Sequence, residues 1–162
     1  DTYVQRDPSA EDLVEMTLLA AAEMRRFGIE PKVALVSHSN FGSDDTSATR
    51  KMRDAVKMLK ARAPELEVDG EMHGDSALNT TMRERTMPQS TLKGEANLLV
   101  FPNIDAANIT LNVVKEMTGA LHVGPILLGV SSPAHVMTPS VTSRGVVNMA
   151  AIATAQAVQL SD

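Results

Sequence analysis

The fold is decided by residues 97–117, which read NLLVFPNIDAANITLNVVKEM. Leu98–Phe101 form a continuous apolar run, which is typical of a strand buried on both faces of a parallel sheet. Pro102 ends the strand because proline has no N–H to donate, and Asn103 is suited to cap a helix. Apolar residues then recur at helical spacing until Gly119, where we expect the helix to end. The stretch is therefore one strand–loop–helix unit.

The same alternation of strand and helix continues along the chain. Short apolar runs predict four strands, at Lys32–Val36, Leu66–Met72, Leu98–Phe101 and Leu121–Leu128. Helical spacing predicts helices over residues 9–27, 44–61, 74–85, 103–118 and 143–160. The expected fold class is α/β, with a doubly wound, mostly parallel sheet of four or five strands and helices on both faces. We expect residues 1–162 to form a single α/β domain.

The amino-acid composition limits the kinds of molecule that the protein is expected to bind and the place where it is expected to work. The formal net charge is −5, which argues against nucleic acid. No apolar run is long enough to span a membrane, and the absence of cysteine fits a cytoplasmic protein. The ten methionines and three phenylalanines predict an aliphatic, methionine-filled core. The chain begins with a polar segment and without methionine, so we expect it to be part of a longer protein.

A polar turn follows the first predicted strand and contains Ser37, Ser39 and Ser43. Serine hydroxyls and backbone N–H groups at the start of a helix can hold a phosphate. The turn lacks the lysine and the glycine spacing of a Walker loop, so from this stretch alone a capped turn without a ligand is the better interpretation.

Two further sets of polar residues stand where helices begin. Asn103, Asp105 and Asn108 follow the Leu98–Phe101 strand, at the edge where open α/β sheets bind ligands. Ser143 and Arg144 open the last predicted helix, where the arginine can pair with a phosphate and the serine can cap the helix or bind a ligand. The alternative is a helix cap followed by a solvent-exposed arginine.

Glu71, His73 and Asp75 cluster at the end of the second predicted strand. They resemble a metal or acid–base site but match no ligand motif, so we predict no metal site. Capping of the next helix by Asp75 is the preferred interpretation.

Five stretches, in the same order along the chain, resemble the second half of phosphate acetyltransferases. They are VALVSHSNFGS (33–43), DGEMHGDSA (69–77), KGEANLLVFPNIDAAN (93–108), GPILLG (124–129) and SRG (143–145). Each stretch is modest alone, but together they cover nearly the whole chain and are specific.

A narrower resemblance is to the C-terminal, phosphotransacetylase-like domain of large bacterial NADP-dependent malic enzymes. It is carried by GEMHGDSAL (70–78), FPNIDAANI (101–109), the loop of residues 133–139 and VNM (147–149). The resemblance implies a domain that senses acetyl-CoA or a related acyl-CoA and assists homo-oligomerisation, as a dimer or higher. It also implies that the parent protein oxidises and decarboxylates malate to pyruvate. No GxGxxG fingerprint is present, so NADP and a divalent metal, Mg or Mn, are expected in the missing N-terminal part and no cofactor here.

Within the acetyltransferase family, the serine and arginine of the Ser-Arg-Gly stretch contact the acyl phosphate and coenzyme, and these positions match Ser143 and Arg144. The family places its proposed general base, an aspartate, about two helical turns later, where this chain has Ala150. Because alanine cannot accept a proton, the chain is expected to have no catalytic residue of its own.

Three functions therefore compete at this stage. The first is a regulatory acyl-CoA-sensing module, for which the expected effector-binding residues are Ser37, Ser39, Ser43, Asn103, Asp105, Asn108, Ser143 and Arg144. The second is part of an active phosphate acetyltransferase that moves acetyl between phosphate and CoA, against which Ala150 argues. The third is an oligomerisation domain with an eroded site.

Overall fold

The computed structural model describes residues 1–139 and 141–159. The chain divides into two compact units, residues 1–109, here called the sheet unit, and residues 110–162, here called the C-terminal unit. Helix α5 (Ile104–Thr118) begins in the first unit and ends in the second.

The sheet unit contains three parallel strands in the order β2-β1-β3. They are β1 (Lys32–Val36), β2 (Glu67–Met72) and β3 (Leu98–Val100). Three of the four predicted strands and the parallel α/β fold are therefore confirmed. The described residues form three strands rather than four or five.

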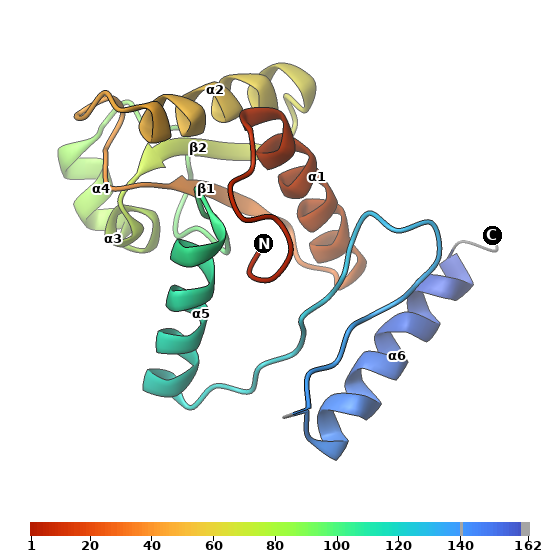
Figure 1. Cartoon of the computed structure of the whole chain (residues 1–162). Coiled ribbons are helices and arrows are strands. Elements are labelled where there is room, and N and C mark those ends of the chain that lie inside the picture. Colours follow the sequence, from red (N-terminus) through yellow and green to blue (C-terminus); the bar gives the residue numbers. More distant parts are fainter. Residues whose placement is uncertain (140, 160–162) are drawn as a thin grey trace. The chain divides into compact units, whose positions relative to one another are not determined.

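One face of the sheet is covered by two capped helices, α1 (Ala10–Arg26) and α2 (Ser47–Arg62), as Figure 1 shows. Ser9 and Thr46 cap them, each with a capping box. The core between these helices and the sheet is aliphatic, and its fully buried members include Leu13, Val33, Leu35, Met52 and Leu59. A buried leucine contributes about 1.5–3 kcal/mol relative to an exposed one, so this layer carries much of the unit's stability.

The other face is covered by short helices and a loop. Ala34 and Met72 of the sheet pack there against Ala77 of α3 (Gly74–Leu78) and Leu92 of the following loop. The single helix expected over residues 74–85 is in fact two, because the Asn79 side chain accepts the Met82 N–H at 2.9 Å and starts α4 (Thr80–Thr86). Asparagine competes with helical hydrogen bonding in this way and favours caps over helix interiors.

A buried arginine holds this second layer together. Arg83 is 1% exposed, and its guanidinium donates to the carbonyls of Ser76 at 2.8 Å and Leu92 at 3.2 Å, and also to Gly94. Five N–H donors in a planar fork allow arginine to bridge several carbonyls at once. Arg83 thereby ties the end of α3 to the loop after α4.

The loop is also fastened to β2 through a buried aspartate. Asp69 is 2% exposed and accepts from Ser90 Oγ at 2.8 Å, Thr91 N at 2.7 Å and Lys60 Nζ at 3.0 Å. Burial by itself raises the pKa of Asp69, but the hydrogen bonds from Lys60, Thr91 and Ser90 outweigh it, so the pKa lies below its ordinary value.

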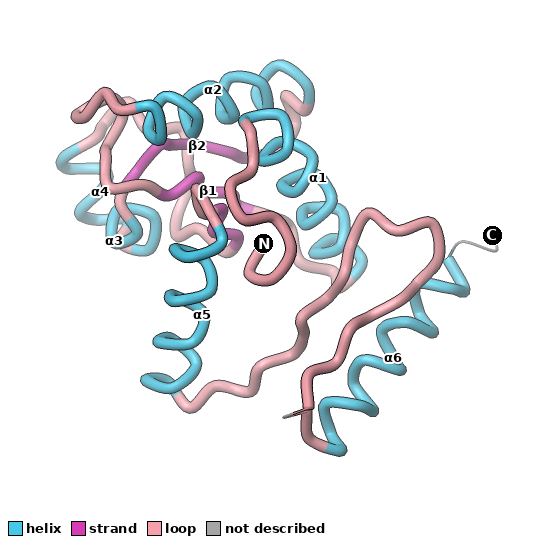
Figure 2. Tube along the Cα trace, viewed as in Figure 1, coloured by secondary structure: helices cyan, strands magenta, loops and turns pink. Residues whose placement is uncertain are grey.

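The C-terminal unit has a different character. Helix α6 (Ser143–Gln159) confirms the predicted last helix as far as Gln159, and Leu160 lies outside the described residues. The strand predicted at Leu121–Leu128 is wrong, because the described residues between α5 and α6 form a loop (Figure 2). Pro125 stands in the middle of that run and has no N–H for a sheet ladder. Among the described residues, no helix has the length and apolarity needed to cross a membrane.

Candidate functional site

Because the three strands are parallel, their carboxyl ends meet at one edge of the sheet, where open α/β folds bind ligands. The turn of residues 37–43 follows β1, His73 follows β2, and Pro102 and Asn103 follow β3. This carboxyl edge is the candidate site within the sheet unit.

The turn after β1 is hydrogen-bonded to the end of β2 along its length. Ser37 N donates to the Met72 carbonyl at 2.8 Å and Phe41 N to the Glu71 carbonyl at 2.7 Å. In return, His73 N donates to the Asn40 side chain at 2.8 Å. Two of the turn's residues have positive φ, Phe41 at 48° and Gly42 at 87°. Glycine adopts this conformation freely, whereas in Phe41 it is strained and is kept only where the surroundings fix the backbone.

Glu71 lies at the centre of this arrangement. Along the β1–β2 ladder, Leu35 pairs with Gly70 and Val36 pairs with Met72, so Glu71 is the extra residue of a β-bulge. Bulges redirect side chains. Here the carboxylate is 0% exposed, and its Oε1 accepts from Ser39 Oγ at 2.7 Å, Gly42 N at 2.9 Å and Arg53 Nη1 at 3.0 Å.

The predicted serines are brought together, but their hydroxyls are already engaged. Ser39 is fully buried, donates to Glu71 and accepts from Asp44 N at 3.1 Å. Ser43 Oγ accepts from Asn40 N at 2.9 Å, and Ser37 Oγ accepts from Ser39 N at 3.3 Å. The three serine hydroxyls thus form hydrogen bonds within the turn or to Glu71.

Charged groups surround the turn on its outer side. A hydrogen bond of 2.7 Å joins His38 Nε2 to Asp44 Oδ2, and it lowers the pKa of Asp44. Burial by itself lowers the pKa of Arg53, but its hydrogen bond and ion pair with Glu71 and its pairing with Asp45 raise it overall. Arg53 therefore keeps its charge next to the buried carboxylate.

The end of β3 carries a second predicted set. Asn103 caps α5 by accepting from Ala106 N at 2.9 Å, as predicted from the sequence. Asn108 is half-buried and donates to the Thr2 carbonyl at 3.0 Å, whereas Asp105 is exposed. Lys51 Nζ lies beside them and donates to the Pro102 carbonyl at 2.9 Å. Of these three predicted residues, Asp105 leaves its side chain most open to solvent.

The start of α6, in the C-terminal unit, holds the third predicted set. Thr142 caps this helix by accepting from Gly145 N at 3.1 Å, so the cap does not come from Ser143. Ser143, Arg144 and Ala150 are all exposed. Among the residues described, no carboxylate forms an ion pair with Arg144.

The side chains of Glu71, His73 and Asp75, which resemble a metal or acid–base site in the sequence, contact neighbouring parts of the fold. Glu71 holds the turn, His73 Nε2 is 2.8 Å from the His38 carbonyl, and Asp75 accepts from Ser76 N at 2.7 Å in the first turn of α3. The N-cap position itself is His73 rather than Asp75. Within residues 1–139 and 141–159, no three His, Cys, Asp or Glu side chains form a group suited to a metal ion.

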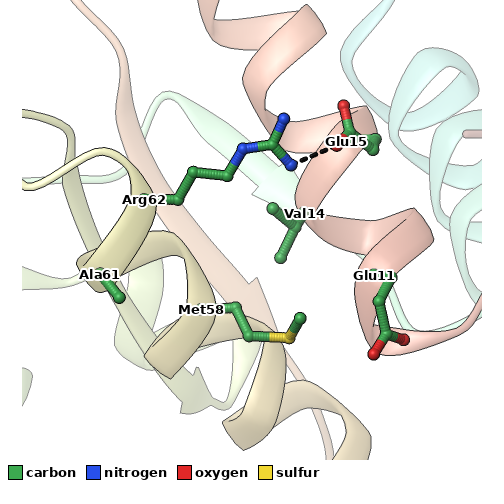
Figure 3. A pocket seen from close by; sticks show the side chains of 6 residues that line it. All are labelled: Glu11, Val14, Glu15, Met58, Ala61 and Arg62. Carbon is green, nitrogen blue, oxygen red and sulfur yellow. Dashed lines mark hydrogen bonds and ion pairs between the residues drawn. The ribbon is translucent and has the colours of Figure 1, made fainter.

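A hollow of about 450 Å³ lies between α1 and α2 in the sheet unit (Figure 3). It is lined by Glu11, Val14, Glu15, Met58, Ala61 and Arg62. Arg62 and Glu15 form an ion pair across it, which occupies the polar groups on opposite walls. None of the predicted site residues lines this hollow, and we assign no function to it.

The family of the chain follows from comparison with known proteins. The family model described as phosphate acetyl/butaryl transferase matches residues 1–154. The chain therefore belongs to the phosphate acetyl/butaryl transferase family. A solved phosphotransacetylase from Streptococcus pyogenes superposes with a TM-score of 0.93 at 30% identity, over 98% of this chain and 48% of that one.

Malic enzymes and phosphate acetyltransferases are both among the curated relatives that match the chain. The NAD-dependent malic enzyme of Rhizobium meliloti is 67% identical over 94% of this chain, and the NADP-dependent malic enzyme of Escherichia coli is 53% identical over 97%. The phosphate acetyltransferase of Bacillus subtilis is 37% identical over 98%. The chain spans 20% and 21% of the two malic enzymes and 49% of the acetyltransferase.

Proposed function

We propose that the chain is the regulatory, acyl-CoA-sensing and oligomerising C-terminal domain of a malic enzyme. One observation carries this proposal: nearly the whole chain matches two malic enzymes at 67% and 53% identity while spanning only about a fifth of each. The same residues match a phosphate acetyltransferase at 37%. A domain of the phosphate acetyltransferase family that forms part of a malic enzyme is suited to bind acetyl-CoA, the ligand of that family, as an effector.

The parent protein is proposed to oxidise and decarboxylate malate to pyruvate in the cytoplasm. Its catalytic site, with NADP and Mg or Mn, would lie in the part of the protein outside these 162 residues. The relatives' names include both NAD and NADP, so an assay of the parent with each dinucleotide is the direct check of the NADP expectation.

Acetyl-CoA is the proposed effector. Its phosphates need cations and hydrogen-bond donors, and Ser143 and Arg144 are exposed at the start of a 17-residue helix, where the helix dipole favours an anion. Within the sheet unit, taken by itself, the carboxyl edge with Asn103, Asp105 and Asn108 is also proposed as effector-binding surface.

An active acetyltransferase is the alternative function. It requires a general base for the CoA thiol, and Ala150 stands where the family resemblance expects an aspartate. Loss of a general base typically costs about 10²–10⁴-fold in rate. We therefore propose that the parent does not transfer acetyl groups between phosphate and CoA at a useful rate.

Oligomerisation is proposed because of exposed apolar side chains. Met117 is 81% exposed, Val147 67% and Val158 59%, all in the C-terminal unit. Apolar side chains that a protein leaves exposed can be buried in an interface with a partner where they gather in a patch. A second copy of the chain is the proposed partner.

The effector assignment is tested by Arg144→Ala in the parent malic enzyme. A charge-assisted hydrogen bond contributes about 1.5–3 kcal/mol, so the acetyl-CoA concentration that produces half of the change in malate oxidation should rise roughly tenfold or more. The control is Arg85→Ala, which removes an exposed arginine from α4 and should leave that concentration unchanged. An unchanged acetyl-CoA response in a folded Arg144→Ala protein would refute the assignment.

A further inference from the structure

The turn after β1 has the donors of an anion site, and the protein's own carboxylate occupies them. A hydroxyl (Ser39), a backbone N–H (Gly42) and a guanidinium (Arg53) converge on Glu71 Oε1 at 2.7, 2.9 and 3.0 Å. Backbone N–H groups in such turns form concave sites that bind phosphates and carboxylates, and arginine strengthens them. Here every one of these donors points at a side chain from the neighbouring strand.

The burial of Glu71 makes this an enclosed cluster rather than a surface pair. Its side chain is 0% exposed, and that of Arg53 is 22% exposed. An ionised carboxylate in such a place is kept only because donors compensate for the lost water. The other oxygen, Oε2, is buried and has no hydrogen-bond partner in the described part of the chain.

The fold also explains why this carboxylate reaches the turn. Glu71 is the extra residue at the β-bulge in β2, between Gly70, which pairs with Leu35, and Met72, which pairs with Val36. Its backbone carbonyl accepts from Phe41 N at 2.7 Å, so main chain and side chain hold the same turn.

We propose that Ser39, Gly42 and Arg53 form an anion-binding site whose resident anion is the Glu71 carboxylate, and that a small carboxylate such as formate binds there once this side chain is removed. The consequence for regulation rests on the proposed function: phosphates of an acyl-CoA effector do not contact these three donors in the wild-type protein. The effector must use other cations, and the exposed Arg144 is the one proposed above.

Anion rescue of Glu71→Ala tests the proposal in the full chain. Removing one partner of a buried charged cluster should lower the midpoint of thermal unfolding by about 10 °C. Sodium formate, compared with sodium chloride at equal ionic strength, should then raise that midpoint in a saturable manner by about 3–5 °C. Inorganic phosphate serves as a second, larger probe.

Glu71→Gln is the matched control because it removes the charge and keeps the volume. This variant and the wild-type protein should respond equally to formate and to chloride, since the side chain still fills the site. An equal formate effect in all three proteins would overturn the proposal. So would a saturable phosphate effect in the wild-type protein that Arg53→Met abolishes, because the site would then be open.

Where Glu71→Ala does not fold in chloride, refolding in formate provides the same test. Recovery of folded protein in formate alone supports the proposal, and failure in both salts overturns it. This readout is independent of acetyl-CoA, so the anion site and the proposed regulatory function can fail separately.

Discussion

The two units of the chain differ in how they bury apolar side chains. In the sheet unit, strands and helices form two core layers with Leu35, Met52 and Leu59 fully buried. In the C-terminal unit, Met149 and Gln156 are the buried residues among those described, and valines along α6 are exposed. Burial of apolar surface is the main favourable term in folding, so the sheet unit is the part expected to supply its own stability.

This difference assigns different tasks to the two units. A unit with a complete core can hold a strained residue such as Phe41, whose φ is positive. The C-terminal unit buries few apolar side chains, and it is the unit that the proposed self-association would cover. Paired substitutions, each with a matched control, test this difference between the units.

The largest effect is expected from Gly70→Ala in the sheet unit. Gly70 has φ of +139°, and a Cβ atom there would lie 2.6 Å from the Leu35 carbonyl oxygen. Because backbone must move to relieve this contact, the free energy of unfolding should fall by about 4 kcal/mol or more, which few domains tolerate. Chemical denaturation monitored by circular dichroism measures it.

Gly28→Ala is the control for this substitution. Gly28 also has positive φ, at +73°, but a Cβ atom there would meet nothing within 4 Å. Its cost should be limited to about 1–2 kcal/mol for the left-handed conformation. Equal costs at the two glycines would show that the close packing of β2 against β1 is not what requires Gly70.

A medium effect is expected from Asp69→Asn, with a defined pH dependence. Losing the charge-assisted contacts to Lys60, Ser90 and Thr91 should cost about 1–3 kcal/mol at neutral pH. Because the pKa of Asp69 is lowered in the folded protein, its contribution is present above the unfolded-state value of about 3.9 and is lost as pH falls through the folded value. The wild-type and variant stabilities should therefore converge in acid.

The matched control is Asp7→Asn, which breaks an ion pair with Lys51 at 2.6 Å on a carboxylate whose side chain is 83% exposed. The Lys51 side chain is 19% exposed, but the carboxylate lies in solvent, so the pair is worth about 0–1 kcal/mol. Urea denaturation at neutral pH should therefore detect little change. A stability gap between wild type and Asp69→Asn that stays constant from pH 7 to pH 2 would contradict the assigned role of the buried carboxylate.

The smallest effect on stability is expected from Val147→Ser in the C-terminal unit. Val147 is 67% exposed, so the free energy of unfolding of the separate chain should change by less than about 0.5 kcal/mol. Self-association, measured by sedimentation velocity across a concentration series, should weaken. Val4→Ser alters a valine that is 65% exposed in the sheet unit and should change neither quantity. Equal changes in self-association for the two variants would show that the C-terminal unit does not form the interface.

The sequence predicted the regular parts of the sheet unit well. The predicted strand Lys32–Val36 agrees with β1 to the residue, and Asn103 caps α5 as predicted, because these signals are local. The strand predicted at Leu121–Leu128 failed for a physical reason. The run is apolar enough for a strand, but a strand also needs a neighbouring strand to pair with, and Pro125 has no N–H to donate to it.

The sequence predicted where the candidate site lies but not that Glu71 would occupy its hydrogen-bond donors. The serines of the turn were found, but nothing local shows that a carboxylate 32 residues from Ser39 would take its hydroxyl hydrogen bond. A usable signal was present: a glutamate in a buried strand beside a serine-rich turn needs a cation, and Arg53 lies on the helix that follows that turn. The roles of Asn103, Asp105, Asn108, Ser143 and Arg144 toward an effector stay predictions.

The contacts of Arg83 bear on the order in which the chain folds. Its guanidinium binds carbonyls only 6 to 11 residues away along the sequence. By contrast, Glu71 meets Ser39 across 32 residues, and Asn97 accepts the Lys32 N–H across 65. Closing a short loop loses less chain entropy than closing a long one. Residues 76–94 can therefore assemble early as a local nucleus, onto which the parallel strands then dock.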